Sequence, residues 1–173
     1  MIVTAHPIVD AVIGRYRTQL DPELDAYRNH VLRCVNYQQE LLAVEALPDT
    51  AALAWAVHDL GLWTANTIDY LEPSVALADE LAGGFGVTDI AAVHKMIREH
   101  HRLRSAGDRL TETFRIADRI DVSRGLLRGP VSRATVQAVV AELPYAGFHQ
   151  TLLRRGTPYA LRHPARPLPM FRW

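Results

Sequence analysis

The chain has little of several things, and each shortage excludes a class of protein. Its 173 residues include one cysteine, Cys34, so the chain can form neither an intramolecular disulfide nor a cysteine-rich zinc site. Charged residues interrupt every apolar segment well before the roughly 18 residues that a membrane-spanning helix needs. Basic and acidic side chains balance to a formal net charge of zero, so no overall field favours nucleic acid or an anionic membrane.

The amino terminus also lacks the features of a targeting signal. Its first residues, MIVTAHPIVDAV, have neither a basic start nor a long apolar stretch, so they are not typical of a secretory leader. We therefore expect a cytoplasmic protein that binds neither a membrane nor nucleic acid.

Two further shortages concern charge of one sign. Lys95 is the only lysine among 19 basic residues, which we attribute to the codon composition of a GC-rich genome. No acidic residue follows Glu142, whereas the same segment carries Arg154, Arg155, Arg162, Arg166 and Arg172. This basic segment is either a solvated or partner-facing tail, or an arginine wall that helps to attract an anionic substrate.

What the sequence does contain is helical periodicity. Hydrophobic residues make up 49% of the chain, which is enough for one buried core at this length. They recur at helical spacing, and no convincing alternation of period two appears. We predict a single all-α domain, a compact helical bundle over residues 1–143, followed by a Pro/Arg-rich extension over 144–173. Because disordered tails are poor in aromatics, we expect this extension to be an ordered wrap over the body with little regular structure.

Capping and breaking residues set the expected helix boundaries. Asp21-Pro22-Glu23 predicts a helix start, with proline at the first helical position and an acid in the first turn. Thr88, Asp108 and Ser132 are expected to cap later helices. The expected helices cover residues 7–20, 22–46, 50–59, 73–83, 89–101, 108–126 and 132–143, with a partly helical stretch at 62–71.

One apolar helical stretch ends in a histidine–aspartate pair. Residues 53–61 read LAWAVHDLG and place His58 beside Asp59 just before Gly61. Burying a carboxylate beside an imidazole costs free energy unless a partner neutralises or hydrogen-bonds the two. A divalent cation can do this, because imidazole and carboxylate are both good metal ligands. The pair alone is weak evidence, since a buried histidine bonded to a neighbouring carboxylate is also an ordinary structural feature.

Other polar residues interrupt apolar helices elsewhere in the chain. They are His30, the pair His100 and His101, and Asp118 with Asp121. Each set comes from a different expected helix, and a bundle can gather inward-pointing side chains from facing helices into one metal site. Two imidazoles and two carboxylates would leave positions on an octahedral ion open for water and substrate.

The order of these residues resembles that of a known family. Four motifs follow one another: Tyr27-Arg28-Asn29-His30, His58-Asp59-Leu60-Gly61, Ile97-Arg98-Glu99-His100-His101 and Ala117-Asp118-Arg119-Ile120-Asp121. This arrangement is similar to the HD superfamily of metal-dependent hydrolases, which carries a histidine, a His-Asp doublet and a distal aspartate on a compact helical bundle. The resemblance spans roughly residues 27–121, about half of the chain.

The resemblance implies a ligand set for a divalent metal, which could be Mn, Fe, Ni, Co, Zn or Mg. His30, His58, Asp59 and Asp118 are the expected ligands. Asp118 is favoured over Asp121 because family members place the ligand in an Ala-Asp pair. The alternative role for Asp121 is a salt bridge or cap for an arginine such as Arg124 or Arg128.

The resemblance also implies catalytic roles. Asp59 could orient the attacking water as well as bind metal, and His100 occupies a family position that can face the substrate. His101 and Arg104 are further candidates for donating to the oxygens of a phosphate. His101 could equally be a surface residue at a helix end, where a cation suits the helix dipole. Two weaker candidates are Arg28, which helix geometry separates from His30, and His94, which reads better as a core or surface residue.

These features lead to a ranked set of functions. The first is hydrolysis of a phosphate monoester or nucleotide by a metal-activated water, with a small anionic substrate. The second is chemistry of the same family without phosphate, either hydration as in cyanamide hydratases or a di-iron oxygenase; a second metal would require His94 and His100 to converge on the first. The third is a metal-binding regulatory domain without turnover. The glutamate that nucleotidase branches of the family carry soon after the His-Asp pair is missing here. The protein could also form a homo-oligomer.

Overall fold

The computed structural model describes residues 1–170, and every regular element in that part of the chain is a helix. The predicted all-α fold is therefore confirmed. None of the helices within these residues combines the length and apolar character needed to cross a membrane. The elements are α1 (Pro7–Arg15), α2 (Arg17–Leu20), α3 (Leu24–Leu42), α4 (Asp49–Val57), α5 (Gly61–Thr64), α6 (Leu71–Ala82), the 3₁₀ turn η1 (Gly83–Phe85), α7 (Ile90–Glu99), α8 (Arg109–Val122), α9 (Arg133–Glu142) and α10 (Phe148–Arg162).

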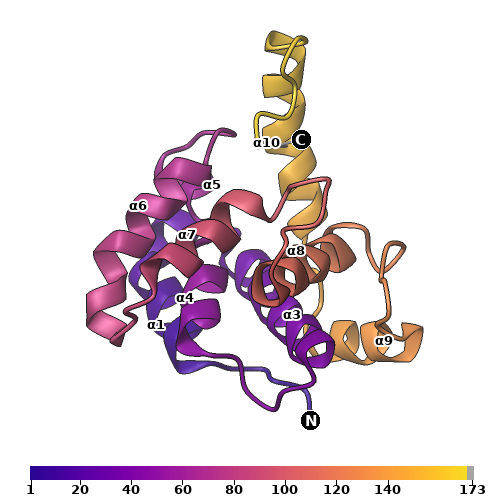
Figure 1. The fold of residues 1–173 in the computed structure, drawn as a ribbon. Coiled ribbons are helices and arrows are strands. Elements are labelled where there is room, and N and C mark those ends of the chain that lie inside the picture. The colour runs from indigo at the N-terminus through magenta and orange to yellow at the C-terminus, as the bar shows by residue number, and fades with distance from the viewer. Residues whose placement is uncertain (171–173) are drawn as a thin grey trace.

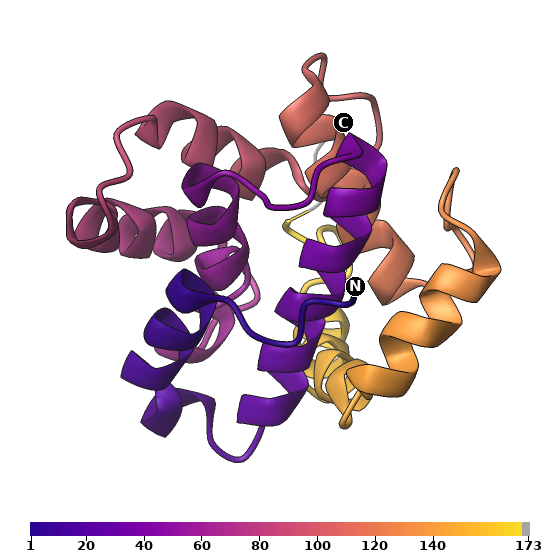
Figure 2. The same cartoon turned by 90° about the horizontal axis from the view of Figure 1, so that it is seen from below.

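Helix α3 is the axis of the bundle. Figures 1 and 2 place it between α1, α4, α6 and α7 on one side and α8, α9 and α10 on the other. Its most extensive packing is along α8, and it also contacts α1, α4, α9 and α10. Most residues from Ala26 to Gln38 are buried, and four of them are strongly polar: His30, Arg33, Asn36 and Gln38. Because buried polar groups need partners, these positions mark where the core contains more than apolar packing.

Several helix boundaries differ from the sequence prediction. The first expected helix breaks at Tyr16 into α1 and α2. Pro22 lies outside the next helix, which begins at Leu24 and ends at Leu42 because Ala43 adopts a left-handed conformation with φ 57°. Asp89, not Thr88, caps α7 by accepting from the Ala92 N–H. Asp108 and Ser132 cap α8 and α9 as predicted.

The expectation of little regular structure after Pro144 is wrong. Residues Phe148–Arg162 form the 15-residue helix α10, which rises from the bundle in Figure 1. Phe148 and Thr151 are buried and Leu152 is half-buried, so the inner face follows helical spacing. Pro158 lies inside the helix, which nevertheless continues to Arg162. Beyond α10 the chain folds back far enough to bury Met170. Arg172 of the predicted arginine wall lies outside the described residues.

Candidate metal centre

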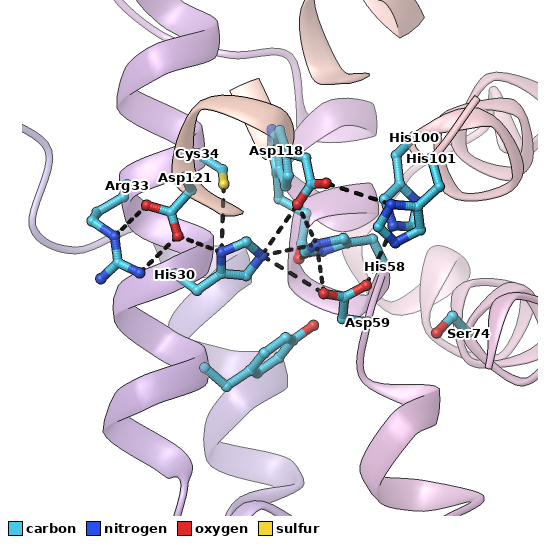
Figure 3. A network of polar contacts seen from close by, with 12 residues as sticks. His30, Arg33, Cys34, His58, Asp59, Ser74, His100, His101, Asp118 and Asp121 are labelled. Carbon is cyan, nitrogen blue, oxygen red and sulfur yellow. Dashed lines mark hydrogen bonds and ion pairs between the residues drawn. The ribbon is translucent and has the colours of Figure 1, made fainter. Parts of the chain in front are cut away.

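Three helices bring four side chains to one point inside the bundle (Figure 3). His30 comes from α3, Asp118 from α8, and His58 and Asp59 from the turn that ends α4. All four are buried, and one potential ligand atom from each lies within 4.8 Å of the others. The structure thus places together the four residues that the motif order predicts as ligands.

The His-Asp pair is delivered by a helix that is apolar on every side. All residues of α4 from Ala51 to Val57 are buried, so this helix runs through the core and ends beside α3. Gly61 then allows close packing, because a Cβ at this position would lie 2.5 Å from the Tyr70 carbonyl oxygen. The Gly61 N–H donates to Ser74 Oγ over 3.0 Å. The turn that carries the pair is therefore fixed from both ends.

The proton on His58 is located by the main chain. Its Nδ1 lies 2.9 Å from the Trp55 carbonyl oxygen. A carbonyl oxygen can only accept a hydrogen bond, so Nδ1 carries the proton. In the neutral ring, Nε2 then presents an unprotonated lone pair to the centre of the group.

His30 is oriented in the same way by a carboxylate. Its Nδ1 lies 2.8 Å from Asp121 Oδ2. Burial raises the pKa of Asp121, but hydrogen bonds from Arg33 and His30 outweigh burial and hold that pKa below its usual range. Burial lowers the pKa of His30 to about 4, so this ring is neutral at pH 7. His30 therefore donates from Nδ1 and keeps the lone pair on Nε2.

Arg33 completes this arrangement. Its Nε and one terminal nitrogen contact the two oxygens of Asp121 at 2.6 and 2.7 Å, and both side chains are fully buried. Its other terminal nitrogen donates to the carbonyl oxygens of Leu143 and Pro144. Asp121 thus forms the buried ion pair that was its alternative role, although with Arg33 instead of Arg124 or Arg128. A carboxylate behind a ligating histidine fixes the tautomer and raises the basicity of the ring.

The two imidazole lone pairs face each other. His30 Nε2 and His58 Nε2 are 3.1 Å apart, and in the neutral rings with protons on Nδ1 neither of these atoms carries a proton. Donor atoms around a small divalent ion at about 2.1 Å lie roughly 3 to 4 Å apart, so this spacing suits two ligands of one cation.

Two carboxylates complete the group. Asp59 Oδ2 lies 3.3 Å from His58 Nε2 and 3.7 Å from His30 Nε2. Asp118 Oδ1 lies 3.6 Å from His30 Nε2, and within the described chain it is buried without a hydrogen-bond partner. Burial raises the pKa of Asp118 to about 8. A cation between these atoms would satisfy the lone pairs and favour the ionised carboxylate, so the donor set fits a divalent metal.

A second group adjoins the first and shares Asp59. His100 donates from Nδ1 to the Ile97 carbonyl oxygen over 2.7 Å, so its Nε2 points away from that bond and lies 3.3 Å from Asp59 Oδ1. His101 Nδ1 lies 3.8 Å from Asp118 Oδ2, and its Nε2 is hydrogen-bonded to the Tyr70 hydroxyl at 2.7 Å. The geometry therefore brings both predicted histidines to the edge of the four-residue group.

Three other candidates are not brought there. His94 Nε2 pairs with Asp79 at 2.7 Å, and His94 belongs to no group of potential metal ligands among residues 1–170. The convergence of His94 with His100 that a second metal would require is therefore not formed. Arg28 binds Asp10, and Arg104 is exposed and does not line the cavity described next.

A cavity of about 590 Å³ opens directly above the group. Asp59, His100, His101 and Asp118 contribute to its floor, and the lining also includes Tyr70, Ser123 and Arg119. The remaining walls are apolar apart from the backbone at Gly156. Within residues 1–170, Arg119 is the arginine that lines the cavity, whereas the sequence prediction named Arg104 as the arginine that would donate to the substrate.

Some residues that shape the site were not predicted. Arg33 follows His30 by three residues, so the two share a helix face, and a lone charge on that apolar face was the available signal. Phe148 stacks on the His30 ring with centroids 4.0 Å apart and planes 11° apart. No local signal joins Phe148 to His30, because 118 positions separate them and the contact depends on how α10 packs.

Comparison with known proteins adds no further constraint: no family model, curated protein or solved structure matches the chain. The helical fold and the buried His/Asp group are compatible with an HD domain.

Proposed function

We propose that the protein is a metal-dependent hydrolase that cleaves a phosphomonoester or a related ester. The observation that carries the proposal is the convergence of two histidine Nε2 atoms with two carboxylates beneath an open cavity. A divalent ion bound there would lower the pKa of a water and polarise an oxygen of the ester.

The residues of the chain have separate tasks in this proposal. His30, His58, Asp59 and Asp118 hold the ion. Asp59 also has a second oxygen, Oδ1, which is buried without a hydrogen-bond partner in the described chain and faces His100 at 3.3 Å. In this proposal, that oxygen accepts a hydrogen bond from the attacking water and so orients it.

The remaining polar residues act on the substrate. The Tyr70 hydroxyl is bonded to His101, and both groups border the cavity together with Arg119. Arg119 supplies positive charge for an anionic leaving group or a phosphoryl oxygen. Apolar walls around the rest of the site limit the entry of competing water.

Hydration of a small uncharged substrate is a second candidate. It is favoured by the scarcity of cations among the lining residues of the described chain (1–170), where Arg119 is the one arginine. A phosphoryl group accumulates charge on its oxygens and benefits from several cationic donors, whereas a nitrile-like substrate does not need them.

Phosphate release distinguishes the two candidates. We would assay alkyl, sugar and nucleoside phosphates with Mn, Co, Ni, Mg and Zn, and compare wild type with Asp59→Ala. Asp79→Ala is the matched control, because Asp79 pairs with His94 outside the site. Release that depends on metal, survives in the control and falls to background in Asp59→Ala supports the hydrolase. Bound metal without release of phosphate from any ester favours hydration.

A further inference from the structure

The cavity above the metal group has walls that a polar substrate would not match. Beyond its polar floor and Arg119, the lining is dominated by aliphatic side chains: Leu62, Ile68, Leu103, Val122, Leu127, Leu152, Leu168 and Met170. The hydroxyls and ring nitrogens of a sugar or nucleobase would lose water against these walls without gaining hydrogen bonds, which is costly. Moving an alkyl or carbocyclic group from water to these walls would instead lower the free energy.

The rim of the cavity is also apolar although it faces solvent. Leu103, Val122, Leu127 and Leu168 are between 39% and 59% exposed, and all four line the cavity. They form almost half of the exposed large hydrophobic residues in the described chain. Exposed apolar residues gathered in one place usually mark a binding site. A ligand with an apolar body would cover this rim.

Gly156 keeps one wall open. It lies inside α10, where glycine costs about 1 kcal/mol relative to alanine. No packing contact explains it, because a Cβ at this position would meet no atom within 4 Å. Gly156 lines the cavity, so its missing side chain leaves volume to the ligand.

We propose that this site binds an amphiphilic small molecule, whose polar head reaches the metal group while an alkyl or carbocyclic body fills the cavity. The volume of about 590 Å³ lies within the roughly 300–1,000 Å³ of pockets that enclose small organic ligands. This inference rests on the proposed function for the head group, where it names the monoester of an apolar alcohol as the substrate class. The preference for an apolar body depends on the walls alone.

A series of n-alkylphosphonates from methyl to octyl tests the body separately from the chemistry. Their dissociation constants would be measured by calorimetry below the micellar concentration, with Mn²⁺ and after chelation. We expect the dissociation constant to fall roughly threefold to fourfold for each added methylene until the cavity is full. Adenosine monophosphate should bind more weakly than octylphosphonate. Equal affinity for methyl- and octylphosphonate, or tighter binding of adenosine monophosphate, would overturn the inference.

A pair of glycine variants assigns the effect to this cavity. Gly156→Leu should raise the dissociation constant of octylphosphonate at least tenfold and leave that of ethylphosphonate unchanged. Gly14→Leu is the control, because Gly14 also lies in a helix with free space around it but is remote from the cavity. Both changes favour helix, so circular dichroism should show both variants folded. Equal effects of the two substitutions would contradict the proposed location.

The outcome also separates this inference from the proposed function. If alkylphosphonate affinity rises with chain length but octyl phosphate releases no phosphate, the phosphohydrolase proposal is wrong and the preference for an apolar body stands. If short polar esters release phosphate and affinity does not depend on chain length, the hydrolase proposal stands and the preference for an apolar body is wrong.

Discussion

His30 Nε2 and His58 Nε2 lie 3.1 Å apart with their lone pairs directed at each other. Each ring is held by its other nitrogen, His58 by the Trp55 carbonyl and His30 by Asp121, so neither can rotate its proton into the gap without losing a buried hydrogen bond. The fold therefore holds two electron-rich nitrogens at a separation that a cation relieves. The predictions below follow from this arrangement and from the contacts that maintain it.

Metal binding should stabilise the protein. An ion that binds only the folded chain contributes about 2.7 kcal/mol when its concentration is a hundredfold above the dissociation constant. For a chain of this size we expect a rise in Tm of roughly 5–10 °C with excess Mn²⁺ or Zn²⁺, and its loss on chelation. His58→Ala should abolish the shift, whereas His94→Ala, outside the group, should retain it. A Tm that does not respond to metal in wild type would contradict the site.

Asp121→Asn should weaken metal binding without removing a ligand. The amide can offer an N–H to His30 Nδ1, which favours the wrong tautomer and turns the Nε2 proton toward the metal. We expect a 10- to 100-fold rise in the dissociation constant of the metal, measured by competition with a chromogenic chelator. Asp10→Asn, at the partly exposed pair with Arg28, is the control and should leave the affinity unchanged. Unchanged affinity in Asp121→Asn would remove its role in positioning His30.

Arg33→Met should destabilise the fold strongly. It leaves Asp121 buried without its main partner, and breaking a buried ion pair typically costs about 3–5 kcal/mol. Arg28 lies on the same helix as Arg33 and forms a partly exposed pair with Asp10 of α1. Arg28→Met breaks that pair, which should cost at most about 1 kcal/mol. Urea unfolding of both variants measures the difference. If both variants lost a similar free energy of unfolding, the buried Arg33–Asp121 pair would contribute no more to stability than the partly exposed pair.

Sequence patterns predicted the parts of this protein that depend on local order. Helical spacing gave the fold class, capping residues gave the starts of α8 and α9, and the motif order selected the four residues that meet in the core. Sequence could not place Arg119 instead of Arg104 on the cavity, because the choice depends on where α8 faces α10. It also failed for α10 itself, whose prolines and arginines suggested irregular structure while its buried Phe148 and Thr151 are spaced as on a helix.

Gly61→Ala should loosen the turn that presents Asp59. The new Cβ would lie 2.5 Å from the Tyr70 carbonyl oxygen and 2.9 Å from Pro73 and Ser74, and overpacking of this kind costs typically about 1–3 kcal/mol. Gly14→Ala has open space in α1 and should be neutral or stabilising by up to about 1 kcal/mol. Thermal unfolding compares the two variants. Equal stability would show that the α5–α6 contact can shift at little cost.

Glu23→Ala should release α10 from the bundle. Glu23 is buried and accepts from Trp63 Nε1 at 2.8 Å, and it also binds Arg154 and Arg155 of α10. Its removal leaves the indole N–H of Trp63 without this acceptor and takes the charge partner from both arginines, at a cost of about 1–3 kcal/mol. We expect amide exchange across α10 to accelerate roughly tenfold while α3 stays protected.

The control for this change is Glu80→Ala, which breaks the exposed pair with Arg15 and should leave α10 exchange unaltered. Helix α10 supplies Leu152 and Gly156 to the cavity, and its Phe148 stacks on the His30 ring. Glu23→Ala should therefore also weaken the binding of octylphosphonate more than that of methylphosphonate. If α10 exchanged faster while the affinity for both phosphonates stayed the same, α10 would not be a wall of the occupied site. If α10 did not respond at all, its attachment would depend on Phe148 and Thr151 packing instead of the Glu23 contacts.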